Sequence, residues 1–221
     1  AADELDQQTE DYSFNWLDPD KKIYVLQNRK FTKAHKLLLT LNGGIADTSP
    51  YRSSYSIDPR LAYYFTEAWG VEVFYAAFSN SSNSTNDALI RTNANIRPNI
   101  YELKSQVGGL LHWAPWYAKI NVFNSVLYFD WSIAGGIGSI TGDVYGSSSG
   151  SNSGSSSSTK NGTASYTTYI LNTGPQFHVS EHFVVRFDYT NSWYKAPLFY
   201  TSGDETWFNS HRFQVGLGFR L

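Results

Sequence analysis

Residues 212–221 read Arg-Phe-Gln-Val-Gly-Leu-Gly-Phe-Arg-Leu, and every second side chain in this stretch is large and apolar. Alternation with a period of two is the pattern of a β-strand whose two faces meet different surroundings. The stretch therefore predicts a strand with one polar face, and its other, apolar face consists of Phe213, Val215, Leu217, Phe219 and Leu221.

The same alternation recurs in further segments along the chain, most clearly at residues 183–190 and 127–133. Segments of about ten residues that alternate in polarity and are separated by turn-like stretches are typical of transmembrane barrels. We therefore expect an all-β fold, an eight-stranded antiparallel up-and-down transmembrane β-barrel. The expected strands lie near residues 36–46, 51–65, 70–79, 101–112, 127–133, 165–178, 183–190 and 212–221.

Composition supports a barrel in a membrane. Aromatic residues make up 17% of the chain, yet the mean hydropathy of -0.37 is that of a soluble protein, so apolar side chains must be dispersed among polar ones. No run of about 18 apolar residues occurs, which excludes a transmembrane helix. A closed barrel is then the remaining structure that satisfies every backbone hydrogen-bonding group in lipid.

Soluble lipocalins and β-sandwiches also alternate, but their apolar face points inward. Here the polar face carries many charged residues. If the apolar face of the barrel points outward, these charged residues must share one small interior. Aromatic residues near the expected strand ends also favour an exterior that faces lipid. These residues are Tyr63, Phe65, Trp69, Trp113, Trp193 and Trp207.

The chain divides into an N-terminal periplasmic extension, residues 1–34, and the barrel, residues 35–221. The start Ala1-Ala2 is the kind of sequence that signal peptidase leaves behind. The absence of cysteine excludes a disulfide scaffold and fits an exported chain. A net charge of -2 without a basic stretch argues against nucleic acid as a partner.

Connections at the two ends of the barrel differ in length, as in outer-membrane barrels with short periplasmic turns and long outer loops. Pro59 and Pro175 each remove a ladder hydrogen bond, so we expect them at a bulge or a strand end. The short turns are expected at 66–69 and 179–182, a longer one on the same side at 114–124, and long polar loops at 80–99, 144–163 and 196–206.

Several motifs resemble a family. The run Val25-Leu26-Gln27-Asn28-Arg29-Lys30-Phe31 is similar to the segment that leads into the first strand of outer-membrane barrel proteins best known from myxobacteria and Bdellovibrio-type bacteria. The run Trp113-Ala114-Pro115-Trp116-Tyr117-Ala118-Lys119 and the later Phe129-Asp130 and Ala134-Gly135-Gly136-Ile137-Gly138 resemble the same group. The architecture also resembles OmpA and OmpX. The resemblance implies fold and location, and the family carries no defined activity.

The closing stretch also resembles the C-terminal signal that the barrel-assembly machinery reads, although this chain ends on Leu221 where that signal usually has Phe. Outer-membrane lipid and lipopolysaccharide are the other expected partners. A periplasmic or cell-surface protein is a further candidate, bound by the loop at 80–99 or by residues 10–31.

Catalysis, a cofactor and a metal site are not expected. The histidines, His35, His112, His178, His182 and His211, show no ligand spacing. Ser210 and His211 are the one candidate pair for a lipid-modifying enzyme, but adjacent strand residues point to opposite faces and cannot act together.

Charges on the inward face are the most informative polar feature. They nearly balance in sign, and the interior of an eight-stranded barrel is just wide enough for side chains to fill it. We expect them to pair and plug the lumen, which makes the protein a scaffold that binds through its loops or its extension. A narrow ion pore and an outer-leaflet lipid enzyme remain alternatives. The expected lumen charge network comprises Asp58, Arg60, Glu72, Glu102, Lys104, Asp130, Arg186, Asp188 and Arg212.

Overall fold

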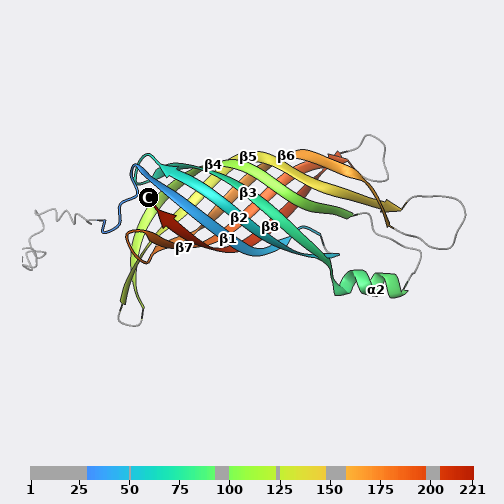
Figure 1. Cartoon of the computed structure of the whole chain (residues 1–221), viewed down its shortest axis with the longest axis horizontal. Helices are drawn as coiled ribbons and strands as arrows, with labels where there is room; N and C mark the ends of the chain where they lie inside the picture. The colour runs from blue at the N-terminus through green and yellow to red at the C-terminus, as the bar shows by residue number, and fades with distance from the viewer. Residues whose placement is uncertain (1–28, 50, 93–99, 123–124, 148–157, 198–204) are drawn as a thin grey trace, which may run out of the picture. The chain divides into compact units, whose positions relative to one another are not determined.

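The computed structural model describes residues 29–49, 51–92, 100–122, 125–147, 158–197 and 205–221. Its strands form a closed ring in chain order, in which each pairs antiparallel with the next and β8 closes on β1 (Figure 1). The predicted eight-stranded barrel is confirmed. The elements are β1 (Lys36–Asp47), β2 (Arg52–Tyr64), β3 (Trp69–Ser82), α2 (Ser84–Thr92), β4 (Ile100–Val122), β5 (Ser125–Ser147), β6 (Ser158–His178), β7 (Phe183–Pro197) and β8 (Glu205–Arg220).

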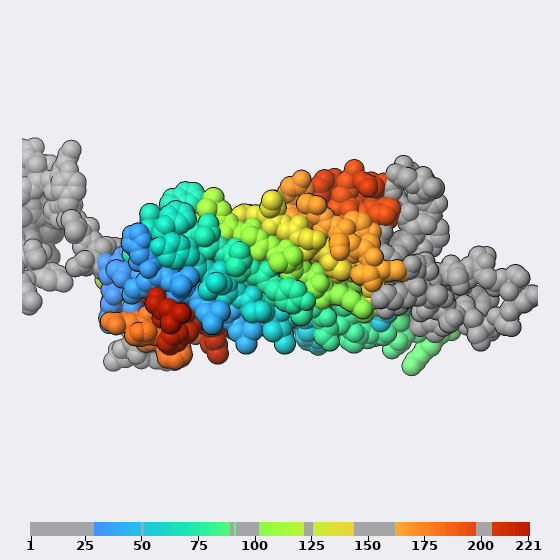
Figure 2. Space-filling model, turned by 45° about the horizontal axis from the view of Figure 1, so that its top comes forward, coloured from blue at the N-terminus to red at the C-terminus, as the bar shows by residue number. Residues whose placement is uncertain are grey.

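The chain forms two compact units, Ala1–Lys30 and Phe31–Leu221, and the second contains the barrel. In the barrel the apolar face of each strand lies outside. Leu217 is 70% exposed, whereas Arg212 on the same strand is fully buried. This inverted arrangement suits a wall that meets lipid. The strands tilt around the barrel, which Figure 2 shows as slanting bands of colour.

The loop expected at residues 80–99 is partly regular. Strand β3 continues to Ser82, and the helix α2 follows it. The side chain of Asn83 caps this helix by accepting a hydrogen bond of 3.0 Å from the backbone N–H of Asn86. Residues 93–99 lie outside the described part of the chain. Within the described residues, no helix is both long and apolar enough to cross a membrane.

Strands β4 and β5 are much longer than predicted, at 23 residues each. The expected connection at 114–124 is therefore wrong, because β4 continues to Val122 and β5 begins at Ser125. A register shift between Trp113 and Trp116 accommodates Pro115, so the ladder resumes beyond the proline. At the other end, β5 and β6 reach Ser147 and Ser158, and residues 148–157 of the expected loop lie outside the described residues.

The two prolines lie inside strands, without a bulge, which corrects the expectation for both. The β2–β3 pairing lapses at Asp58 and Pro59 and resumes at Arg60 in the same register. The β6–β7 pairing lapses in the same way at Gly174 and Pro175. Each proline keeps its pairing with the strand on its other side, β1 and β5 respectively. A missing N–H thus interrupts one ladder locally and leaves the alternation of faces intact.

Candidate functional site

The lumen holds a network of buried charges, and Glu72 on β3 lies at its centre. Glu72 Oε1 accepts a hydrogen bond of 2.9 Å from Arg60 Nη1, and Oε2 accepts one of 2.6 Å from Arg186 Nη1. These side chains are at most 2% exposed. His112 Nε2 also lies 3.3 Å from Glu72 Oε2. A single carboxylate therefore joins guanidinium groups from β2 and β7 across the interior.

A second carboxylate, Asp58, extends the network toward β8. Asp58 Oδ2 accepts hydrogen bonds from Gln214 Nε2 at 2.6 Å and from Arg212 Nη1 at 2.9 Å. The guanidinium of Arg212 also lies 5.5 Å from the ring centroids of Phe74 and Phe78, which adds cation–π contacts.

Asp188 completes the network on β7. Its Oδ2 lies 3.1 Å from Arg186 Nε and accepts a hydrogen bond of 2.7 Å from Asn42 Nδ2. The arginines Arg60, Arg186 and Arg212 thus face the carboxylates Asp58, Glu72 and Asp188, so the formal charges of this cluster cancel. Cancellation is what allows ionised groups to remain in a water-poor interior.

A separate cluster fills the mouth at the end of the barrel with the short turns. Asp130 Oδ2 lies 2.9 Å from Lys33 Nζ and 2.6 Å from His178 Nε2. On its other side, His178 Nδ1 accepts a hydrogen bond of 2.6 Å from Arg220 Nη2, so the ring N–H is on Nε2 and points at Asp130. The ring of Phe31 stacks on that of His178 with the centroids 5.6 Å apart. Residues just before β1 therefore cover this mouth.

Glu67, in the turn between β2 and β3, holds the segment of residues 31–34, just before β1, in place. Its carboxylate accepts hydrogen bonds of 3.0 to 3.1 Å from the backbone N–H groups of Lys33 and Ala34. Two backbone donors on one carboxylate are charge-assisted bonds of the stronger kind.

Glu67→Ala should release the segment and speed trypsin cleavage after Lys33 about tenfold or more, because a hydrogen bond to a charged group contributes about 1.5 to 3 kcal/mol. The measurement is the rate at which the peptide ending at Lys33 appears by mass spectrometry. Glu181→Ala, which removes an exposed glutamate from the β6–β7 turn, is the matched control and should cleave as wild type does. Equal rates for the two variants would show that Glu67 does not hold the segment.

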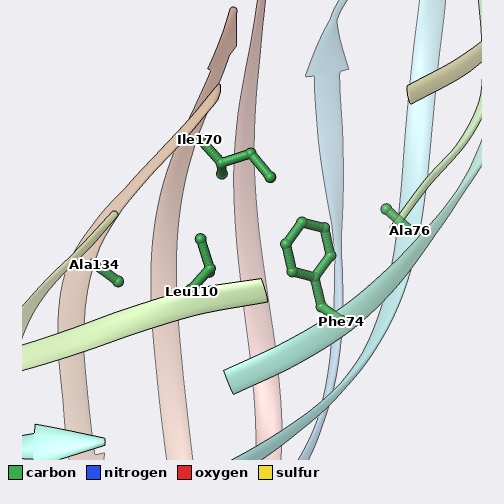
Figure 3. Packing of buried hydrophobic residues seen from close by; sticks show 5 residues of the cluster. All are labelled: Phe74, Ala76, Leu110, Ala134 and Ile170. Carbon is green, nitrogen blue, oxygen red and sulfur yellow. The ribbon is translucent and has the colours of Figure 1, made fainter. Parts of the chain in front are cut away.

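Apolar side chains also lie inside the barrel, and the ring centroid of Phe74 is 5.1 Å from the guanidinium of Arg60 in the central network. Phe74, Ala76, Leu110, Ala134 and Ile170 form one cluster, and Figure 3 shows them converging from the consecutive strands β3 to β6, with Phe74 and Ala76 both on β3. A second cluster contains Leu103, Ile140, Tyr194 and Ala196. The ring of Tyr194 stacks between those of Tyr166 and Phe208, at centroid distances of 6.2 and 5.7 Å.

Most of the predicted lumen charges are buried inside the barrel, but they divide between two clusters. Arg212 belongs to the central network, where its Nη1 lies 2.9 Å from Asp58 Oδ2. Asp130 belongs to the mouth cluster. The buried residues of the predicted set are Asp58, Arg60, Glu72, Asp130, Arg186, Asp188 and Arg212.

Glu102 and Lys104 lie outside both clusters, which corrects the prediction for them. A register shift between Leu103 and Ser105 changes the phase of β4, so Leu103 points inward and the Lys104 side chain is 51% exposed. Lys104 Nζ lies 2.6 Å from Asp143, and Glu102 Oε2 lies 3.4 Å from Arg52 Nη2.

Sequence reasoning missed several members of these clusters. Gln214 and Arg220 lie on the polar face of β8, so the alternation of polar and apolar residues in this strand was enough to predict that they point inward. Lys33 and Glu67 lie outside the alternating segments, and no pattern marks them. The remaining members that were missed are Phe31 and Asn42.

The candidate Ser–His pair is separated as expected from strand geometry. Ser210 is buried in the lumen, whereas His211 lies on the outer wall, where its Nδ1 is 2.6 Å from the hydroxyl of Tyr189. Among the described residues, no three side chains of His, Cys, Asp or Glu lie together as metal ligands would.

Several solved structures are similar to this chain over most of its length. The N-terminal β-barrel domain of Pseudomonas aeruginosa OprF is 9% identical, with a TM-score of 0.49 over 85% of this chain and 98% of that one. The attachment invasion locus protein Ail of Yersinia pestis is 15% identical, with a TM-score of 0.42 over 85% of this chain and 99% of that one. Neisserial surface protein A is 12% identical, with a TM-score of 0.43 over 84% of this chain and 95% of that one.

Curated protein sequences contain no significant match to this chain. The sequence pattern of the outer membrane protein beta-barrel domain, however, matches residues 28–220, nearly the whole chain. The chain therefore belongs to the family of outer membrane protein beta-barrel domains, and it lies in the outer membrane.

Proposed function

We propose that this protein is a non-conducting barrel that serves as a membrane-anchored scaffold and acts by binding through segments outside its wall. The observation that supports the proposal is the burial of charged and apolar side chains inside the barrel. The mouth cluster, the central charge network and the two apolar clusters all lie inside the wall, and most of their side chains are buried.

The burial of these side chains disfavours the pore. In a barrel of this size, side chains alone can occupy the whole interior. Opening a path would separate Glu72 from Arg60 and Arg186, and leave buried charges unpaired at a cost of several kcal/mol. Catalysis is disfavoured for a different reason, since Ser210 and His211 lie on opposite sides of the wall.

Three partners follow from the same proposal. The exposed apolar wall suits outer-membrane lipid and lipopolysaccharide, and β8 suits recognition by the barrel-assembly machinery. A periplasmic or cell-surface protein would be the functional partner. The kinship with barrels of myxobacteria and Bdellovibrio-type bacteria stays an expectation from the motifs Val25–Phe31 and Trp113–Lys119.

Conductance tests the proposal directly. Purified full-length protein in a planar lipid bilayer should give no discrete current steps, in a bilayer where a general porin inserted as a positive control conducts. Steady steps from the wild-type protein, with an ion selectivity that changes in Arg186→Ala, would establish the pore in place of the scaffold.

A further inference from the structure

A hollow on the outer wall of the barrel has the size of a small-molecule site. Its volume is about 500 Å³, within the range of about 300 to 1,000 Å³ that is usual for such sites. It spans five neighbouring strands, from β5 through β6, β7 and β8 to β1. Outward side chains such as Phe187, 45% exposed, and Phe213, 57% exposed, line it. We call this hollow the wall groove, and it faces the lipid of the outer membrane.

The ladder registers place the outward lining of the wall groove in two neighbouring rows that cross the strands. In the first row Trp131 pairs with Pro175. Phe187 pairs with Val215 in the same row, and Val215 pairs with Gly43. The second row contains Thr173, Tyr189, Phe213 and Ile45.

The length of the wall groove is that of one hydrocarbon chain. Strands lie about 4.8 Å apart, so the steps from β5 to β1 cover about 19 Å. Half of the hydrocarbon core of a bilayer is about 15 Å thick. Because the strands of such barrels are tilted, the rows run obliquely to the membrane plane, and a chain that follows them lies obliquely within one leaflet.

Two residues without long side chains form the floor of the wall groove. Gly43 has no side chain, and a Cβ there would meet the backbone oxygen of Ser56 at 3.9 Å, an ordinary contact. Pro175 lies where the β6–β7 ladder lapses. Beside this floor the rings of Tyr189 and Phe213 pack against each other at a centroid distance of 4.9 Å. The wall groove is thus a preformed trough between large side chains.

The polar groups of the lining are already engaged. Trp131 Nε1 donates a hydrogen bond of 3.0 Å to Thr173 Oγ1, and the hydroxyl of Tyr189 lies 2.6 Å from His211 Nδ1. Asp188 is the one charged residue among the described residues of the lining, and its side chain points into the lumen. Such a surface suits a hydrocarbon chain and offers no compensating bonds to a sugar or a phosphate.

One end of the wall groove lies at the level of the lipid headgroups. Trp131 is opposite Trp116 in the ladder, and the ring of Trp116 lies 6.4 Å from that of Trp113. Trp113 in turn stacks on Trp69 at 6.0 Å. Belts of aromatic residues lie at membrane surfaces, and the short turns at this end of the barrel face the periplasm. The leaflet there consists of phospholipid, whereas lipopolysaccharide occupies the opposite leaflet.

We propose that the wall groove binds one acyl chain of a phospholipid from the periplasmic leaflet. The glycerol of this lipid lies beside Trp131, and the chain crosses β6, β7 and β8 to end at Gly43. A preformed concave wall contacts the chain on several sides, and these dispersion contacts hold it more strongly than a flat wall holds its neighbours. The site is independent of the scaffold function, because it does not depend on whether the lumen conducts.

Native mass spectrometry of the full-length barrel tests the site. The folded protein, released from mixed micelles of detergent and phosphatidylethanolamine, should retain one lipid molecule. Gly43→Leu places a side chain in the wall groove and should lower the lipid-bound fraction at least fivefold. Gly135→Leu is the matched control, because Gly135 is also exposed, lies outside the wall groove and has nothing within 4 Å of an added Cβ. Its lipid-bound fraction should equal that of the wild type.

The same spectra contain the outcomes that would overturn the proposal. These are equal retention in Gly43→Leu and the wild type, an equal loss in both variants, or no lipid on the wild-type protein. Preferential retention of lipopolysaccharide from an equimolar mixture with phosphatidylethanolamine would overturn it as well.

Photolabelling of the wild-type protein locates the chain without a substitution, and so decides the proposal even if Gly43→Leu does not fold. The probe is phosphatidylethanolamine with a diazirine at the tip of one acyl chain, in vesicles that contain the barrel. Ile45 and Val215 should take up at least fivefold more label than Ile137, which is 64% exposed on the wall outside the wall groove. Equal labelling would mean that lipid contacts the wall without a site, and would refute the proposal.

Discussion

Replacing Arg186 by alanine is expected to destabilise the barrel by about 3 to 5 kcal/mol, the cost of removing one partner of a buried charge pair. The guanidinium contacts both Glu72, at 2.6 Å, and Asp188, at 3.1 Å. Alanine leaves these buried carboxylates with fewer cations.

Unfolding by urea in detergent micelles, followed by tryptophan fluorescence, measures this loss. Lys195→Ala is the matched control, because Lys195 and Glu205 form an ion pair of 3.1 Å whose side chains are 50% and 51% exposed. Such a pair contributes at most about 1 kcal/mol. A similar small loss for Arg186→Ala would mean that the lumen is wet, and would favour the pore.

Gly136→Ala should be a severely damaging small substitution in the wall, with a loss of at least about 3 kcal/mol, at the upper end of overpacking effects. A Cβ at this position would lie 1.9 Å from the carbonyl oxygen of Gly109 on β4. The obstacle is backbone, so the β4–β5 ladder would have to separate.

Gly135→Ala provides the control one residue away. Gly135 faces outward, and a Cβ there meets nothing within 4 Å. The folded fraction after refolding into detergent, read from heat-modifiable migration on gels, should fall sharply for Gly136→Ala and stay at the wild-type level for Gly135→Ala. Equal yields would show that β4 and β5 approach each other less closely than the structure has them.

The alternation of apolar and polar residues was enough to predict the strands, because one face of each strand meets lipid and the other meets the lumen. The ends of β4 and β5 escaped prediction because there the two strands pair only with each other among the described strands and have no lumen on either face. The shifts near Leu103 and Trp113 also change the phase of the alternation. Counting every second residue across such a shift therefore assigns a side chain to the wrong face. Lys104 was expected inside for this reason, and its side chain is 51% exposed.

Pairing within the lumen was harder to predict than burial. Closing β8 on β1 brings Arg212 near residues 154 positions away, and its guanidinium reaches past β1 to Asp58 on β2. Which cation meets which anion depends on side-chain length and on neighbouring groups such as Gln214, and strand order alone does not contain that information.

The lapses at Pro59 and Pro175 also have a mechanical consequence. They weaken the β2–β3 and β6–β7 seams, which lie four strands apart in the ring and divide the wall into two four-stranded sheets, β3 to β6 and β7 through β2. Glu72 belongs to the first sheet, while Arg60 and Arg186 belong to the second. Under a force that stretches the ring, these ion pairs resist the separation of the two sheets. The sheets can separate only after Glu72 loses its contacts with both arginines.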